Sequence, residues 1–161
     1  MAAAVLVAVI ATWALWPRPA ASPQGSASRY LNASACLLTG PGGITPGTAG
    51  APVWAAMRTA SQATHVMVSY LPDSGPADVT PMLNALAERQ CGVIIATGDA
   101  AAAVVKAARA HPRQSFLLVA TTGSAAAGDP PNTVVVPAAD ASGRIDQALH
   151  VLAAHATVSG S

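Results

Sequence analysis

Short apolar runs alternate with longer amphipathic stretches along most of this chain. The short runs are rich in valine, isoleucine and leucine, which is typical of strands that are buried on both faces of a parallel sheet. The longer stretches are rich in alanine and repeat their apolar residues at helical spacing. Strands are expected at residues 35–39, 65–70, 92–97, 116–120 and 133–136, and helices at residues 52–63, 79–89, 100–110 and 142–155.

This alternation predicts an α/β fold, a three-layer αβα sandwich around a parallel five-stranded sheet in the common strand order 2-1-3-4-5. Pro52 and Pro81 are each expected in the first turn of a helix, where a missing amide proton costs nothing. The last helix carries one apolar stripe that is expected to face the core. Its members are Ile145, Ala148, Leu149, Val151 and Leu152.

A different pattern occupies the first 29 residues. Residues 2–16 are uncharged and mostly apolar, and this run is shorter than the roughly 20 residues that usually span a bilayer. It indicates an export segment, either a cleaved signal peptide or a short membrane tether, and a buried core helix is the alternative. Residues 17–29 have the composition of a flexible linker. We therefore expect an extracytoplasmic folded domain at residues 30–157, followed by a tail at residues 158–161.

Composition and charge restrict the classes of partner that we expect the chain to bind. The chain has 161 residues, enough for one core, and carries a formal net charge of +1 with only 9% charged residues. Its lysines and arginines are scattered along the sequence, so they give no electrostatic footprint for nucleic acid or for anionic lipid.

Two cysteines, Cys36 and Cys91, open the first strand and directly precede the third. In the expected strand order these two strands are parallel neighbours, so their starts nearly meet. An oxidising compartment would then permit a disulfide. Two buried free thiols and a lipidated Cys36 are the alternatives.

The loop TGPGGITPGTAG follows the first strand, at the edge of the sheet where open α/β folds bind ligands. Gly42 and Gly43 are candidate ligand-binding residues there. The loop lacks both the third glycine of a dinucleotide fingerprint and the lysine of a P-loop. A turn with positive φ at one or two glycines is favoured over a phosphate cradle.

Polar residues follow two further strands at the same edge. Asp99 comes after the third strand, and Thr121 and Thr122 come after the fourth. They resemble part of a receiver-domain phosphorylation site, but its acidic pair and its lysine are missing. The four histidines show no metal-ligand spacing, and no serine lies in a nucleophile elbow. We expect neither a catalytic site nor a cofactor, and keep Asp99, Thr121 and Thr122 as candidate ligand-binding residues.

A resemblance emerges when the motifs are taken in order. Over residues 35–154, the chain resembles the amino-terminal lobe of the basic membrane protein family. The segments that carry this resemblance are, in order, CLLTGPGGI, a helix with Trp54, PMLNALAERQCGVIIATGDA, KAARAHPRQSFLLVA and NTVVVPAADASGR. These are substrate-binding lipoproteins of ABC importers, several of which bind purine nucleosides. The resemblance implies one lobe of a type I periplasmic-binding fold, and some members have cysteines at the starts of the same two strands.

Several family positions differ in this chain. Gly40, Thr45 and Pro46 stand where the family has acidic residues, and Ala49 stands where it has the aromatic side chain that stacks on the base. The resemblance and these differences leave two possible functions. One is a single substrate-binding lobe that takes a small molecule of the nucleoside class and works with an ABC permease or as a homodimer. The other is a membrane-tethered interaction or sensory domain that has lost the ligand site.

Overall fold

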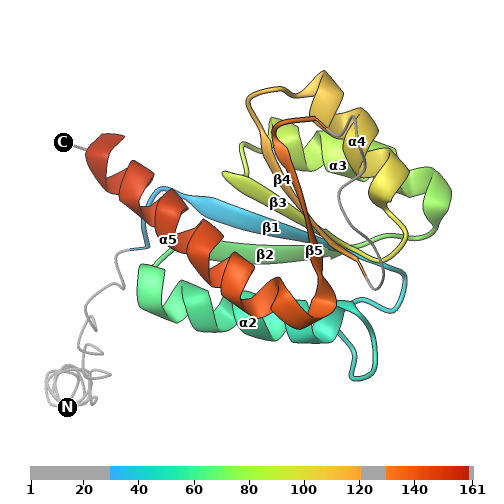
Figure 1. The fold of residues 1–161 in the computed structure, drawn as a ribbon, viewed down its shortest axis with the longest axis horizontal. Helices are drawn as coiled ribbons and strands as arrows, with labels where there is room; N and C mark the ends of the chain where they lie inside the picture. The colour runs from blue at the N-terminus through green and yellow to red at the C-terminus, as the bar shows by residue number, and fades with distance from the viewer. Residues whose placement is uncertain (1–29, 121–129, 160–161) are drawn as a thin grey trace, which may run out of the picture.

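The computed structural model describes residues 30–120 and 130–159 and forms a three-layer α/β sandwich (Figure 1). All five strands are parallel and lie in the order β2-β1-β3-β4-β5. This confirms the predicted fold class and strand order. The strands are β1 (Ser34–Thr39), β2 (Met67–Pro72), β3 (Val93–Thr97), β4 (Ser115–Ala120) and β5 (Thr133–Pro137).

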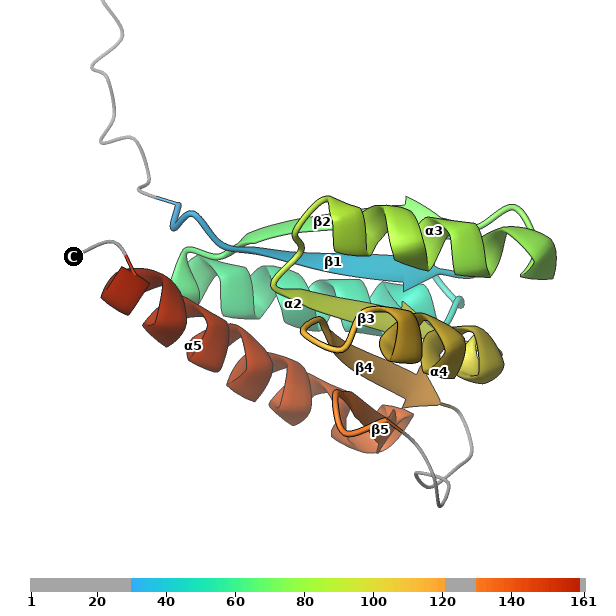
Figure 2. The same cartoon turned by 90° about the horizontal axis from the view of Figure 1, so that it is seen from above.

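Two helices cover each face of the sheet, as Figure 2 shows from above. The helices α2 (Gly50–Thr64) and α5 (Ala141–Ser159) pack together on one face, and α3 (Pro76–Glu88) and α4 (Ala101–Ala110) pack on the other. A short 3-10 helix, η1 (Ala138–Asp140), links β5 to α5. Because side chains alternate along a strand, Leu37 and the adjacent Leu38 of β1 enter opposite cores.

A disulfide joins Cys36 to Cys91, whose Cα atoms lie 5.9 Å apart. Both residues are buried on the side of the sheet that α3 and α4 cover. Neighbouring parallel strands bring the two cysteines together, as the strand order predicted. The disulfide is therefore confirmed, and the free thiols and the lipidated Cys36 are not what the structure contains.

Three details differ from the sequence prediction. β2 begins at Met67 rather than at residue 65, because His65 takes a left-handed φ of 58° and ends α2. Pro81 lies inside α3 and not in its first turn, because the helix begins earlier, at Pro76 after Gly75, which has a φ of 151°. Val151, expected in the core, is exposed on α5.

Within residues 30–120 and 130–159, no helix combines the length and the hydropathy needed to cross a membrane. The expected export segment at residues 2–16 and the linker at residues 17–29 lie outside the described residues.

Candidate functional site

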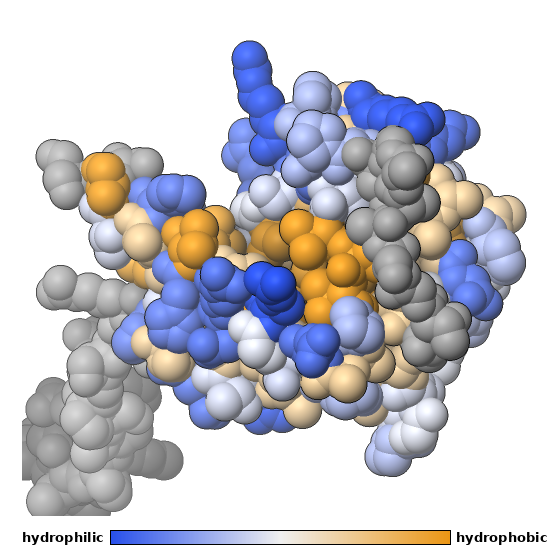
Figure 3. Space-filling model, in the orientation of Figure 1, coloured by the Kyte–Doolittle hydropathy of each residue, from blue (hydrophilic) through white to orange (hydrophobic). Residues whose placement is uncertain are grey.

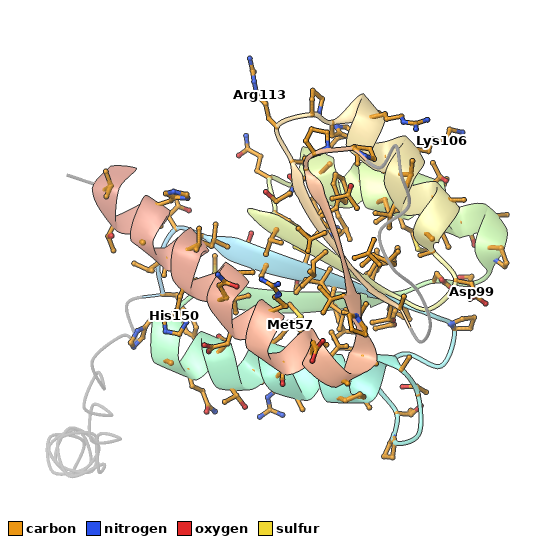
Figure 4. All side chains as sticks on the ribbon, viewed as in Figure 1. Met57, Asp99, Lys106, Arg113 and His150 are labelled. Carbon is orange, nitrogen blue, oxygen red and sulfur yellow. A yellow bond between two sulfur atoms is a disulfide. The ribbon has the colours of Figure 1, made fainter. Side chains whose placement is uncertain are left out.

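The carboxyl ends of the parallel strands meet at one edge of the sheet, which we call the carboxyl edge. Ligands of open α/β sheets usually bind there. Gly42 and Gly43 lie in the loop between β1 and α2, and Asp99 lies between β3 and α4 (Figure 4). The structure therefore brings these three candidates to the same edge. Thr121 and Thr122 lie outside the described residues.

The glycine-rich loop between β1 and α2 folds back on itself through internal hydrogen bonds. The Gly43 N–H donates to the Gly40 carbonyl oxygen at 2.9 Å, and the Thr48 N–H donates to the Thr45 carbonyl oxygen at 3.1 Å. The Thr48 hydroxyl lies 2.9 Å from the Gly43 carbonyl oxygen. Gly43 and Gly47 have φ values of 59° and 91°, which glycine adopts most easily. The turn with positive φ at two glycines is thus confirmed.

Two threonines end neighbouring strands at this edge. Thr39 ends β1 and is 1% exposed, and Thr97 ends β3 and is 5% exposed. The register pairs Leu38 with Ala96, so the next residue on each strand, a threonine, lies beside the other. Among residues 30–120 and 130–159, neither hydroxyl oxygen has a hydrogen-bond partner. A buried hydroxyl without a partner costs about 1–3 kcal/mol, so this pair requires an explanation.

Gly50, the first residue of α2, covers Thr39 closely. A Cβ atom at Gly50 would lie 2.7 Å from Cγ2 of Thr39 and 2.5 Å from the Gly43 carbonyl oxygen. The Thr39 side chain therefore points toward the amino terminus of α2 and the turn before it. The glycine at this position permits that close approach.

Two carboxylates flank the end of β1. Asp73 follows β2, and its backbone N–H donates to the Thr39 carbonyl oxygen at 2.9 Å. Its side-chain Oδ1 is buried and has no hydrogen-bond partner among the described residues. Asp99 follows β3 on the other side and is exposed. The carboxyl edge therefore presents carboxylate acceptors on both sides of the end of β1.

Three helices begin at this edge without a side-chain cap. Their N-cap residues are Ala49 for α2, Gly75 for α3 and Ala100 for α4. The first amide groups of an uncapped helix need outside acceptors, so they can donate to a ligand. Together with the hydroxyls and carboxylates, they suit a small molecule that has both hydrogen-bond donors and acceptors.

Sequence reasoning did not select Thr39, Asp73 or Thr97 as ligand-binding residues. The available signal was a threonine at the last position of each of two otherwise apolar strands. In the described part of the chain, no three histidine, cysteine or acidic side chains gather as metal ligands would.

Comparison with known proteins supports the fold. No family model matches the chain, and no curated protein matches it. Among solved structures, it is similar to a protein described as a putative lipoprotein from Peptoclostridium difficile 630, a fragment, with a TM-score of 0.63 and 15% identity. That match covers 73% of this chain and 98% of the other.

A second similar structure is a solute-binding protein of an ABC transporter system from Aeropyrum pernix K1. The TM-score is 0.57 and the identity is 18%, and the match covers 64% of this chain but 28% of that longer one. A dehydroquinate dehydratase-like protein from Bifidobacterium longum is also similar, with a TM-score of 0.50, 11% identity and coverage of 74% of this chain and 98% of that one. At these identities, the likeness establishes a shared fold.

Proposed function

We propose that this chain is an extracytoplasmic, noncatalytic domain of the substrate-binding type, which binds a small polar molecule at the carboxyl edge of its sheet. The observation that carries the proposal is the pair of buried, unpartnered hydroxyls of Thr39 and Thr97. A ligand that hydrogen-bonds to them would offset the cost of burying them. The fold shared with an ABC solute-binding protein supports the same role.

An extracytoplasmic location has separate support. A Cys36–Cys91 disulfide persists in oxidising compartments and is rare in the cytosol. A structure described as a putative lipoprotein has the same fold. We propose that residues 2–16 direct the domain out of the cytoplasm and tether it to the membrane.

The resemblance to the basic membrane protein family suggests a ligand of the nucleoside class and an ABC permease as partner. Asp73 supports the ligand class, because its unpartnered Oδ1 could accept hydrogen bonds from sugar hydroxyls. The described residues form one sheet, and we propose that this lobe works with an ABC permease or pairs with a second copy of this chain.

A second candidate is a membrane-tethered interaction or sensory domain that has lost its ligand site. It is favoured by one observation: the loop between β1 and α2 contains no aromatic side chain that could stack on a base. Such stacking supplies much of the affinity for planar ligands.

A thermal-shift panel tests the proposal on residues 30–161 with purine and pyrimidine nucleosides, then with amino acids and sugars. A ligand at about 100 times its dissociation constant adds roughly 2.7 kcal/mol, which raises the midpoint by several degrees. Thr39→Val with Thr97→Val should abolish the shift. Thr64→Val, which alters a buried hydroxyl bonded to the Ala60 carbonyl oxygen at 2.8 Å, should preserve it.

The outcomes separate the two candidates. A ligand shift that disappears only in the Thr39 and Thr97 variant supports a site at the carboxyl edge. No shift with any ligand, on protein shown to be folded by circular dichroism, contradicts the binding function and favours the interaction domain.

A further inference from the structure

We infer that the opposite edge of the sheet is a surface that lies against an anionic lipid bilayer. We call it the amino edge, because the parallel strands begin there. It comprises the segments that precede the strands and the last turn of α5. The segments are residues 30–33, 65–66, 89–92, 111–114 and 130–132.

Basic side chains outnumber acidic ones at the amino edge. Its segments contain Arg89 and Arg113, and the acidic Glu88 lies directly before Arg89 at the end of α3. Figure 4 shows Arg113 projecting outward from the loop before β4. At the carboxyl edge, the described loops and η1 contain Asp73, Asp99 and Asp140 but no lysine or arginine.

Helix dipoles are sufficient to explain why basic residues lie at one edge and acidic residues at the other. Cations stabilise the carboxyl ends of helices and anions the amino ends, and all helices that follow parallel strands point the same way. Charge alone therefore does not identify a membrane surface. A second property of the amino edge is needed, one that helix dipoles do not explain.

Exposed apolar side chains provide that property. Tyr30, just before β1, is 57% exposed, Met67 at the start of β2 is 45% exposed, and Val158 in the last turn of α5 is 77% exposed. Apolar side chains mixed with arginines are typical of a surface that contacts lipid headgroups.

An apolar groove of about 350 Å³ adjoins this edge. It lies between α5 and the strands β4 and β5, and Val134 and Val151 line it. Figure 3 shows this groove as a hydrophobic hollow on the face toward the viewer. The exposed apolar surface therefore extends from the ends of the strands along one side of α5.

The chain itself enters the domain at this edge. Twenty-nine residues precede Tyr30, and in Figures 1 and 2 the described chain begins beside the carboxyl end of α5. A linker at residues 17–29 reaches at most roughly 45 Å when fully extended. This inference rests on the proposed membrane tether, because an inserted segment at residues 2–16 would hold the amino edge close to the bilayer.

Hydrogen bonds from Asn132 fix the loop before β4, which carries Arg113. Asn132 Nδ2 lies 3.1, 3.0 and 2.8 Å from the carbonyl oxygens of Ala108, His111 and Gln114. These contacts bind the loop that carries Arg113 to the start of β5. The surface is therefore formed before it meets lipid, and the carboxyl edge then faces away from the membrane.

The test uses the full chain, with its disulfide intact, reconstituted into phosphatidylcholine vesicles that contain 30 mol% phosphatidylglycerol. One sample carries a fluorophore on Val158→Cys at the amino edge. The matched sample carries it on Ala138→Cys, an exposed position in η1 at the carboxyl edge. A nitroxide on the lipid headgroup quenches a fluorophore that lies at the membrane surface.

Strong quenching at position 158 and little at position 138 is the expected result. Arg89→Gln with Arg113→Gln should weaken the contact of the amino edge with the bilayer. The ratio of molecules with this edge on the membrane to molecules with it off the membrane should fall about fivefold for each arginine removed. Arg58→Gln with Lys106→Gln removes the same charge from exposed positions inside α2 and α4 and should leave the quenching unchanged.

Three results would overturn the inference: equal quenching at the two positions, equal loss of quenching in the two charge variants, or failure of the full chain to enter the vesicles. Ligand binding at the carboxyl edge is measured separately by the thermal-shift panel. Ligand binding and the orientation on the bilayer can therefore fail independently, whereas failure to enter the vesicles also contradicts the proposed tether.

Discussion

At the scale of single residues, Thr39 and Thr97 hold hydroxyl groups away from water, and neither hydroxyl has a hydrogen-bonding partner in the part of the chain that the structure describes. Valine has nearly the same shape and no polar group to desolvate. We therefore predict that Thr39→Val or Thr97→Val raises the free energy of unfolding of the unliganded protein by about 1 kcal/mol each. Urea denaturation followed by circular dichroism measures this change.

Thr64 is the matched control, because its buried hydroxyl donates to the Ala60 carbonyl oxygen at 2.8 Å. Thr64→Val removes that bond and should lower the free energy of unfolding by about 1 kcal/mol. If the three variants all lose stability alike, the hydroxyls of Thr39 and Thr97 are satisfied in solution, and the argument for a ligand site there fails.

The same residues show how far a sequence reveals a site. Gly42, Gly43 and Asp99 could be placed at the carboxyl edge, because each follows a recognisable strand. Which hydroxyls lack partners could not be predicted, since this depends on how the loop before Gly50 folds over Thr39. Such satisfaction of buried groups is a property of tertiary packing, and no local pattern encodes it.

At the scale of elements, α3 contains Pro81 in its sixth position. A proline there removes an amide that would bond to the carbonyl four residues earlier, and its ring crowds that carbonyl. Pro81 is exposed, so replacing it disturbs no core contact. We predict that Pro81→Ala raises the free energy of unfolding by about 1–3 kcal/mol, measured by urea denaturation.

Pro52 is the control for Pro81, because it is also exposed but lies in the first turn of its helix, α2. Its missing amide belongs to the first four of the helix, which have no partner inside the helix in any case. Pro52→Ala should therefore change the stability by less than about 0.5 kcal/mol. Similar gains from the two replacements would mean that helix position does not set the cost of Pro81.

The disulfide ties β1 to the turn before β3, across a sequence separation of 55 residues. Closing a loop of this length in the unfolded chain contributes about 4 kcal/mol in the chain-entropy model. We predict that a reductant lowers the melting temperature of the protein by ten degrees or more, on the order of what this energy implies for a domain of this size. Differential scanning calorimetry with and without reductant measures the shift.

A variant with both Cys36→Ala and Cys91→Ala is the control for this experiment. It should melt at the lower temperature and show no response to reductant. Intact mass of the parent protein, about two hydrogens lighter before reduction, establishes that the bond was present. Equal masses before and after reduction would contradict the disulfide itself.

The predicted boundaries of helices and strands agreed with the structure where a buried apolar segment ended at residues that stop a strand. They differed from the structure elsewhere. The runs of β3 and β4 were placed within one residue, because these strands are central and apolar on both faces. β2 is an edge strand with mostly exposed residues, so its start depended on the left-handed φ of His65. Val151 belongs to the predicted apolar stripe, yet it is 50% exposed and lines the groove between α5 and the strands β4 and β5.

At the scale of the whole molecule, the parallel sheet gives the domain two chemically different ends. The acidic carboxyl edge contains the candidate ligand site, and the basic and apolar amino edge receives the N-terminal segment. The tether that we propose at one end and the candidate site at the other would suit a solute that approaches from outside the membrane.

The sheet also joins the two cores into one cooperative unit. Leu37 and Leu38 are adjacent in β1 but pack in opposite cores, and Ile94 and Ile95 do the same in β3. One core therefore cannot lose its strands while the other keeps them. We predict a single unfolding transition for residues 30–161 in urea.

Two probes test this prediction independently. Trp54 is the only tryptophan in residues 30–161, and it packs against the core under α2 and α5. Its fluorescence reports that core, whereas far-ultraviolet circular dichroism reports all helices and strands. The two curves should coincide in midpoint and slope. If the fluorescence changes first, the layer of α2 and α5 unfolds separately, and the sheet alone does not couple the two cores.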